Sequence, residues 1–362
     1  MTRSDGVLRV LAIVGARPNF MKIAPLMRVF KENPDRFDAR LLHTGQHYDE
    51  AMKDAFFRQL GIPQPDIDLG VGSGSHAVQT AEIMQRVEPV IDDLQPDVVL
   101  VVGDVNSTIA CALVAVKKSI PVVHVEAGLR SGDKKMPEEI NRVLTDQISE
   151  LLFTTEADAA VNLEREGIPA DKVHFVGNVM IDTLLANKER AIPAVDTLNA
   201  LPDFDGSVEN FGILTLHRPS NVDDAVVLRR LLETLCDLSN EVPLVFPIHP
   251  RTRARLIEDE LSEMLEGSRI CLTEPLGYLQ LLGLMSAARV VLTDSGGLQE
   301  ETTALGVPCI TIRENTERPI TITEGTNSLV GTDTARIRAC FEDIVKTGGK
   351  KGRIPALWDG AA

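Results

Sequence analysis

Two carboxylates directly follow apolar segments, a placement that suits proton-transfer groups. Asp104 comes after the run VLVVG, and Glu126 comes after VVHV. A carboxylate that ends a buried strand costs free energy unless it has a partner or a task, so both side chains are expected to point into a site. Glu138 and Glu139 follow Pro137 at the predicted start of a helix, where the helix dipole alone favours acidic residues. Asp104 and Glu126 are therefore the stronger acid–base candidates.

The segment VGARPNFMK could bind a phosphate group. Gly15 permits a tight turn, and a helix expected to begin near residue 19 offers its unpaired N–H groups to an anion. Arg17 and Lys22 place two cations beside that turn, as diphosphate recognition requires. An ordinary turn with solvated basic residues would have the same sequence, so this segment alone does not decide between the two interpretations.

The segment TDSGGLQEE is a more specific signal. It follows one predicted strand and opens a helix, so Ser295, Gly296 and Gly297 can present a hydroxyl and N–H groups to phosphate. Glu301, about one turn later, is well placed to accept from both hydroxyls of a ribose. A lone helical glutamate is more often simply exposed, but its position after this turn favours the binding role.

Two histidines end predicted strands in the second half of the chain: His217 in ILTLHRPSN and His249 in VFPIHPR. A lone histidine is more often structural. Two histidines at equivalent strand ends favour a functional role as much as a structural one. No Gly-x-Ser-x-Gly turn occurs, which counts against acyl transfer. The residues together predict an enzyme that acts on a diphosphate-linked ligand by acid–base chemistry, and they leave the exact reaction open.

Strands and helices must alternate to bring these residues together. Near-continuous Val, Leu and Ile indicate strands buried on both faces of a parallel sheet. The predicted strands are 7–14, 39–43, 98–102, 122–125, 151–154 and 173–176, then 211–215, 244–248, 270–273, 290–293 and 309–312. Helical patterns cover 22–32, 77–93, 107–117 and 138–148. This α/β pattern predicts the GT-B fold, two Rossmann-like doubly wound domains with a cleft between them.

The alternation breaks around residues 187–210, where proline, aspartate and glycine accumulate. We therefore expect an N-terminal domain over 1–186 with the acid–base residues and a C-terminal, ligand-binding domain over 187–345. The tail, 346–362, is expected to return to the N-terminal domain.

Composition limits the partners of the chain. The net charge of −16 counts against nucleic acid and anionic membranes. No apolar run approaches the roughly 18 residues that cross a bilayer, and the N-terminus reads as a strand, not as a signal peptide. The 5 scattered cysteines indicate reduced thiols in a cytoplasmic protein. With no Cys/His cluster and no dinucleotide fingerprint, neither a metal nor a cofactor is expected.

Nine motifs, in order, carry a resemblance to a known family: GARPNFMK, TGQHYD, GDVNST, HVEAGLRSGD, MPEEINR, LHRPSN, PIHPR, TDSGGLQEE and ENTERP. The chain resembles the non-hydrolysing UDP-N-acetylglucosamine 2-epimerase family over residues 10–358. The resemblance implies a homodimer, a UDP-sugar substrate and a mechanism without metal or NAD. A base removes the C2 proton while UDP leaves C1, and UDP re-adds to the 2-acetamidoglucal after a proton returns to the other face.

The resemblance also assigns roles by motif. It implies Asp104, Glu126 and Glu138 as acid–base groups and His217 as the group that stabilises the departing diphosphate. Uracil would lie against 274–281. The substrate-binding residues that it implies are Arg17, Lys22, His249, Leu276, Leu281, Ser295, Gly296, Gly297, Glu301 and Arg318.

The chain departs from better-known bacterial members of that family in two places. SGDKKMPEE lacks their aromatic insertion, and HRPSN lacks their Arg-Glu pair. The shorter form is also similar to 2-epimerases of UDP-2,3-diacetamido sugar acids. The motifs leave three further functions open: a hydrolysing UDP-GlcNAc 2-epimerase, a retaining GT-B glycosyltransferase and a non-catalytic UDP-sugar sensor.

The resemblance also implies that many bacterial members of this family bind substrate at a second, regulatory site. Gln46 and His47 match part of it. Tyr48 replaces an arginine of that site, and the stretch 219–221 replaces a second one. Losing two charge-assisted contacts would weaken the binding of a second diphosphate, so we expect activity that needs no allosteric substrate.

Overall fold

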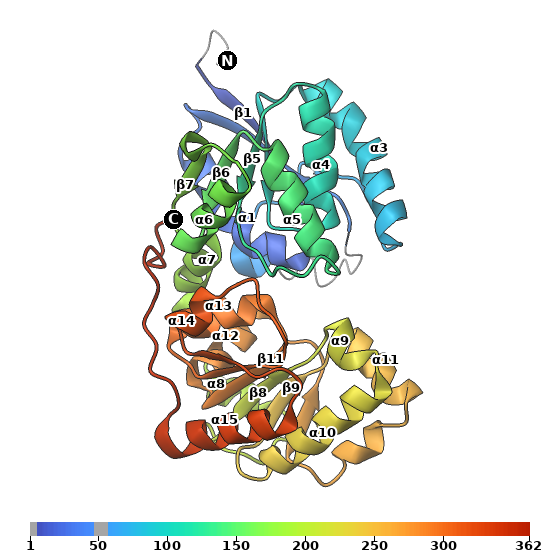
Figure 1. Ribbon diagram of the computed structural model, residues 1–362, viewed down its shortest axis with the longest axis vertical. Coiled ribbons are helices and arrows are strands. Elements are labelled where there is room, and N and C mark those ends of the chain that lie inside the picture. The colour runs from blue at the N-terminus through green and yellow to red at the C-terminus, as the bar shows by residue number, and fades with distance from the viewer. Residues whose placement is uncertain (1–5, 47–56) are drawn as a thin grey trace. The chain divides into compact units, whose positions relative to one another are not determined.

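The computed structural model describes residues 6–46 and 57–362 and divides into two compact units (Figure 1). The first unit is Met1–Ala186 together with Ala356–Ala362, and the second is Asn187–Pro355. The tail therefore joins the first unit later than the expected boundary at 345/346. Residues 350–355 stay with the second unit because Arg353 N–H donates to the Glu324 carbonyl at 2.8 Å.

The first unit is built on a seven-stranded, all-parallel sheet in the order β3-β2-β1-β4-β5-β6-β7. Its strands are β1 (Leu8–Val14), β2 (Phe37–His43), β3 (Ile67–Asp68), β4 (Val98–Val102), β5 (Val122–Val125), β6 (Leu151–Thr154) and β7 (Val173–Phe175). Its helices are α1 (Arg17–Glu32), α3 (His76–Leu94), α4 (Asn106–Lys117), α5 (Pro137–Ile148), α6 (Ala157–Arg165) and α7 (Val179–Lys188).

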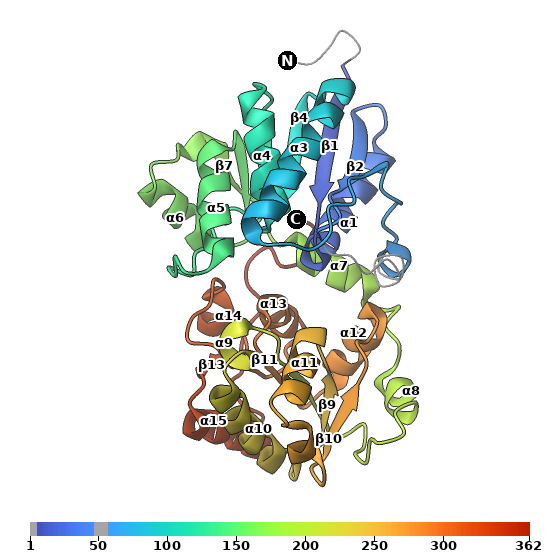
Figure 2. The ribbon, with the colours of Figure 1, turned by 90° about the vertical axis from the view of Figure 1, so that its right-hand side faces the viewer.

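Helices α3, α4 and α5 lie side by side, with α4 in the middle (Figure 2). Nearly all of α4 is buried, because small residues such as Ala110 and Ala112 let it sit between the sheet and its two neighbours. Their apolar side chains join those of β1, β4 and β5 in one core. This packing fixes the turns that precede α4 and α5, which carry the candidate residues.

The second unit repeats the design with a six-stranded parallel sheet in the order β10-β9-β8-β11-β12-β13. Its strands are β8 (Gly212–Thr215), β9 (Leu244–Pro247), β10 (Ile270–Thr273), β11 (Val290–Thr293), β12 (Cys309–Thr311) and β13 (Asn327–Leu329). Its helices are α8 (Ala194–Asn199), α9 (Pro219–Val222), α10 (Ala225–Ser239), α11 (Pro250–Glu258), α12 (Tyr278–Ala287), α13 (Gly296–Leu305), α14 (Ile320–Thr323) and α15 (Thr334–Thr347). Helices α10 and α15 pack side by side on the main core of this unit.

The predicted strands and helices are confirmed with small shifts at their ends, and two short strands, β3 and β13, were not predicted. Helix α1 begins at Arg17, before the expected start, because Pro18 is compatible with the first turn of a helix. The expected linker is part of the second unit: it contains α8, and Ile192 N–H donates to the Leu279 carbonyl at 3.0 Å. No helix within the described part of the chain is long and apolar enough to cross a membrane.

Candidate functional site

The candidate residues of each unit gather at the carboxyl edge of its sheet. Because parallel strands all end at the same edge, the turns that follow them bring together residues far apart in sequence. In the first unit these turns follow β1, β2, β4 and β5, and in the second they follow β8 to β12. Each edge therefore collects side chains from several separate motifs.

Glu126 directly follows β5 and is held in a buried ion pair with Lys22 of α1. Glu126 and Lys22 are each only 3% exposed. The backbone of Glu126 has φ of 70°, a left-handed conformation that costs a residue with a side chain roughly 1–3 kcal/mol. The sequence placed Lys22 at a phosphate-binding turn, whereas the structure shows its ammonium group on the Glu126 carboxylate.

Asn19 fixes the start of α1, the helix that carries Lys22, to the neighbouring strands. Its amide oxygen accepts from the N–H groups of Gly15 at 3.3 Å and Ala16 at 3.1 Å, and its amide nitrogen donates to the Val102 carbonyl at 2.9 Å. The first turn of α1 is thereby fixed to the end of β4. The side chain of Arg17 lies outside the described residues.

Asp104, directly after β4 and Gly103, is paired with the guanidinium group of Arg142 in α5. Arg142 is 1% exposed and also donates to Glu139 at 2.7 Å. Glu139 accepts in addition from the Ser131 N–H at 2.9 Å and the Gly132 N–H at 2.9 Å. One buried arginine therefore orients the Asp104 carboxylate and connects it to α5.

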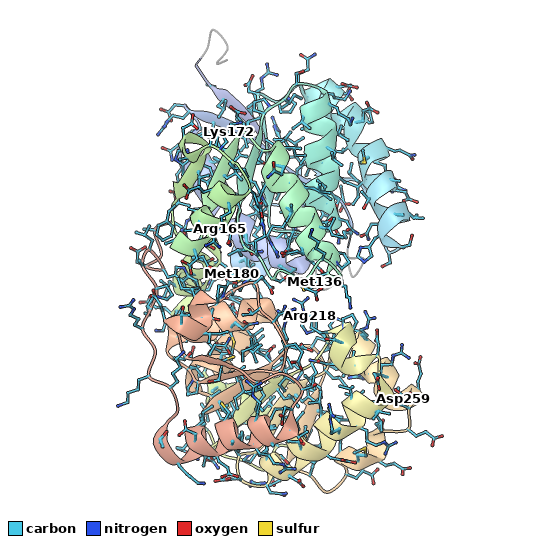
Figure 3. All side chains as sticks on the ribbon, in the orientation of Figure 1. Met136, Arg165, Lys172, Met180, Arg218 and Asp259 are labelled. Atoms are coloured by element: carbon cyan, nitrogen blue, oxygen red, sulfur yellow. The ribbon has the colours of Figure 1, made fainter. Side chains whose placement is uncertain are left out.

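The two adjacent glutamates of MPEEINR have different environments. Glu139 is buried and bound to Arg142, whereas Glu138 is only partly buried in the same first turn of α5. That helix begins after Met136, which Figure 3 labels. Glu139 is therefore a structural anchor, and Glu138 is the glutamate of this pair whose carboxylate can meet a ligand.

Gln46 lies beside the N-terminus of α4. Its side-chain oxygen accepts from the N–H of Ser107 at 3.1 Å and from the Ser107 hydroxyl at 2.7 Å. Its backbone carbonyl accepts from Gln79 at 3.3 Å. Gln46 thus connects the turn after β2 to α3 and α4, while His47, the other predicted regulatory residue, lies outside the described residues.

At the edge of the second sheet, Asp294 organises the turn after β8. Its carboxylate accepts from the backbone N–H groups of His217 at 2.9 Å and Arg218 at 2.8 Å and lies 2.8 Å from the His217 Nδ1. Burial would raise the pKa of Asp294, but the His217 ring and these N–H groups outweigh it and lower that pKa. The Asp294 carboxylate is therefore ionised and makes Nδ1 of His217 a donor.

His217 and His249 lie next to each other at this edge. Their ring centroids are 5.5 Å apart, so the structure brings together the two histidines that the sequence placed at strand ends. His249 is exposed and caps α11, where its Nδ1 accepts from the Arg251 N–H at 3.2 Å. The His217 side chain is 34% exposed and can therefore meet a ligand.

The turn TDSGG has the geometry of an anion-binding helix start. Ser295 is the N-cap of α13 but makes no side-chain capping bond. Its own N–H donates to the Thr293 hydroxyl oxygen at 2.9 Å. A Cβ atom at Gly296 would lie 2.8 Å from the Glu317 carboxylate, which explains the need for glycine there. Gly296 and Gly297 thus leave the first N–H groups of a ten-residue helix uncovered by their own side chains.

Three arginines surround Glu317 beside this helix start. Arg313 and Arg318 lie 2.8 Å from its carboxylate, and Arg218, labelled in Figure 3, lies 3.8 Å away. Burial would raise the pKa of Glu317, but the three guanidinium groups hold it far below its ordinary range. Arg318 also pairs with Glu300 at 2.6 Å. Three guanidinium groups thus gather beside this helix start, and arginine is a side chain suited to binding a diphosphate.

The remaining predicted binding residues lie on α13, α12 and the turn after β10. Glu301 is 5% exposed and lies against Tyr278; burial raises the pKa of that phenol, and the Glu301 carboxylate raises it further. Leu276, in the turn, and Leu281, in the first part of α12, are both partly buried. The structure therefore places all three predicted residues at one end of the second sheet.

Sequence reasoning missed the groups that hold these side chains in place. They are Asn19, Glu139 as an anchor, Arg142, Asp294, Arg313 and Glu317. Most of them stand inside the quoted motifs, so their positions were visible, but ion-pair partners distant in sequence were not. Within residues 6–46 and 57–362 no group of three or more His, Cys, Asp or Glu could hold a metal ion.

Comparison with known proteins identifies similar sequences and structures. A family model described as UDP-N-acetylglucosamine 2-epimerase matches residues 29–362. The chain is 43% identical to a UDP-N-acetylglucosamine 2-epimerase of Methanococcus maripaludis, over 92% of this chain and 91% of that protein. It is 41% identical to a UDP-2,3-diacetamido-2,3-dideoxy-D-glucuronate 2-epimerase of Pseudomonas aeruginosa, over 90% and 88%.

Among solved structures, the chain matches Methanocaldococcus jannaschii UDP-GlcNAc 2-epimerase in complex with UDP-GlcNAc and UDP. The TM-score is 0.89 at 40% identity, over 98% of this chain and 97% of that one. This match and the two parallel sheets confirm the predicted fold class of two Rossmann-like domains, GT-B. The family model and the relatives confirm the resemblance to UDP-N-acetylglucosamine 2-epimerases that the motifs carry.

Proposed function

Because this chain belongs to the UDP-N-acetylglucosamine 2-epimerase family, we propose that it reversibly inverts C2 of UDP-N-acetylglucosamine to give UDP-N-acetylmannosamine without net hydrolysis. One observation carries the proposal. At one strand edge, Glu126 is buried against Lys22, and Asp104 is oriented by Arg142. Two fixed carboxylates are what proton removal and return at one carbon require.

The chemistry explains why both a leaving-group site and proton-transfer groups are needed. The C2 proton of the sugar is not acidic, so departure of UDP from C1 must accompany its removal. The resulting 2-acetamidoglucal accepts a proton on the opposite face before UDP re-adds. Asp104, Glu126 and Glu138 are the proposed acid–base groups, and between them they serve the two faces of C2.

The second unit is proposed to bind UDP. The helix start at Ser295–Gly297 and the arginine cluster around Glu317 support binding of the diphosphate, and Glu301 supports binding of ribose. Nδ1 of His217 is held by Asp294, so its Nε2 is the nitrogen left to meet the departing phosphate. Since Nδ1 already carries a hydrogen, Nε2 can donate only from an imidazolium ring, and that donor would stabilise the charge that develops as UDP leaves. The motif assigns substrate binding to Arg17 and Lys22. We propose that Lys22 acts through its ion pair with Glu126.

The second candidate substrate is a UDP-2,3-diacetamido sugar acid. It is favoured by the 41% identity to the Pseudomonas aeruginosa enzyme and by the shorter segment before MPEE. The ratio of kcat/KM values for the two substrates would decide between them. A homodimer and a cytoplasmic location remain predictions from the sequence.

The proposed reaction is tested by incubating the purified protein with UDP-GlcNAc in D₂O and following the sugar by NMR. We expect deuterium at C2 and growing UDP-ManNAc, at a rate unaffected by EDTA. Free N-acetylmannosamine as the product would instead identify a hydrolysing enzyme. Loss of all activity with EDTA, restored by a divalent ion, would contradict the metal-free reaction.

We further expect that no second UDP-GlcNAc molecule is needed for activity. Arg251 is one of three cations, with Lys134 and Lys135, that could replace a lost regulatory arginine, but it forms a bidentate pair with Asp223 at 2.9 and 2.6 Å. Gln46 is bonded to Ser107. Purified UDP-ManNAc should therefore be consumed from time zero, as followed by NMR. A lag that trace UDP-GlcNAc abolishes would contradict this prediction.

A further inference from the structure

His124 is a buried histidine that the proposed reaction does not use. It lies in the middle of β5 and is 0% exposed. Its Nδ1 lies 2.6 Å from the Asp146 carboxylate, and its Nε2 lies 2.8 Å from the Gly103 carbonyl oxygen. A carbonyl oxygen can only accept, so Nε2 must carry a hydrogen.

The Asp146 carboxylate requires a hydrogen on Nδ1 as well. Burial would raise the pKa of Asp146, but the carboxylate lies 2.7 Å from Arg130 and accepts from the Gly128 N–H at 3.1 Å, and its pKa is lowered. An ionised carboxylate is an acceptor only, so both ring nitrogens of His124 donate and the ring is an imidazolium. A neutral ring would leave one nitrogen facing an acceptor without a proton between them.

The charge of the ring is balanced by a chain of ion pairs. Asp146 also lies 2.7 Å from Arg130, and Arg130 pairs with Glu166 at 2.6 Å. Two cations and two anions thus alternate from His124 to Glu166, the carboxylate at the end of α6. Buried charges that are paired in this way are costly to disturb, because removing one leaves its partner unsatisfied.

This chain of ion pairs holds the backbone on both sides of the acid–base candidates. Gly103, held by His124, directly precedes Asp104. A Cβ atom at Gly103 would lie 2.9 Å from the Lys22 ammonium, so the Gly103 backbone lies close to the partner of Glu126. On the other side of Glu126, the Gly128 N–H donates to Asp146 at 3.1 Å.

We propose that His124 is a positioning residue that donates from both ring nitrogens and, through Asp146, holds the ends of β4 and β5 so that Asp104 and Glu126 keep their reactive geometry. The proposal rests on the proposed function of those two carboxylates. Misplacement of reacting groups by about 1 Å can lower a rate roughly 100-fold, so the expected effect is on kcat.

The protonation state is measured on the unaltered, full-length protein. With ¹⁵N-labelled histidine, long-range ¹H–¹⁵N spectra distinguish an imidazolium from either neutral tautomer, and nuclear Overhauser contacts with Gly103 identify the His124 ring. We expect both ring nitrogens to carry hydrogen in the folded protein, because each faces an acceptor. A nitrogen without hydrogen there would overturn the proposal.

The positioning role is measured by kinetics of His124→Asn, with Val101→Ala as the matched control. Val101 is equally buried and pairs in register with His124, so its truncation disturbs the same strands without removing a charge. We expect kcat of His124→Asn to fall roughly 100-fold with KM changed only a few-fold, and kcat of Val101→Ala to stay near that of the unaltered enzyme. Equal kcat values for both variants would overturn the proposal.

The two measurements also separate this inference from the proposed function. A protein that does not epimerise UDP-GlcNAc would contradict the proposed function, while the NMR result would still decide the state of His124. If His124→Asn does not fold, Arg130→Gln removes the second cation of the same chain, whose side chain is 11% exposed, and should lower kcat in the same direction. An Arg130→Gln variant with unchanged kcat would then overturn the positioning role.

Discussion

Replacing Glu126 by Gln is expected to lower turnover of UDP-GlcNAc by about 100-fold or more while the protein stays folded. The amide keeps the size of the side chain and can still accept from Lys22, but it cannot take the C2 proton. The measurement is kcat together with the rate of deuterium entry at C2 in D₂O. Both rates should fall together, because both depend on the same proton transfer.

Glu82→Gln is the matched control for this substitution. Glu82 is an exposed helical glutamate paired with Arg86, so the same chemical change is made away from the strand edge. Its kcat should equal that of the unaltered enzyme. A Glu126→Gln variant that turns over within a few-fold of this control would show that Glu126 is not an acid–base group.

Arg142→Met is expected to destabilise the protein by about 3–5 kcal/mol, because it leaves the Glu139 and Asp104 carboxylates without their shared buried cation. Arg86→Met removes an exposed arginine, 44% accessible, from its pair with Glu82 and from the Leu69 and Gly70 carbonyls, which water can reach, and should cost about 1 kcal/mol. The free energy of unfolding of each variant, from urea titration followed by circular dichroism, provides the comparison. Equal losses in the two variants would contradict the structural role assigned to Arg142.

Most of the fold could be predicted because the central strands have a strong pattern. The strands Val98–Val102, Val122–Val125 and Leu151–Thr154 were predicted to the residue, since a strand covered by helices on both faces is nearly all apolar. The strands Ile67–Asp68 and Asn327–Leu329 were missed. Each lies at an outer edge of its own sheet, and each is too short and too polar to show the apolar pattern of a strand.

The candidate site was predictable where residues follow strands and unpredictable where partners meet through space. Asp104, Glu126 and His217 could be found because each directly follows an apolar run. The pairing of Lys22 with Glu126 could not, since it joins the second turn of α1 to the end of a strand about a hundred residues later. A sequence motif identifies the residue type at a position but carries no information on which ion pair forms there.

The C-terminal segment Ala356–Ala362 has a practical consequence for spectroscopy. It contains Trp358, the single tryptophan of the chain, which is 2% exposed and donates from Nε1 to the Thr155 carbonyl at 3.0 Å. All indole fluorescence of this protein therefore originates in the first unit, at a position contributed by the far end of the sequence. Excited selectively, this fluorophore should emit at short wavelength while the segment is docked and shift to the red when it detaches. Its emission thus reports the attachment of the C-terminus to the first unit, with no indole of the second unit contributing to the signal.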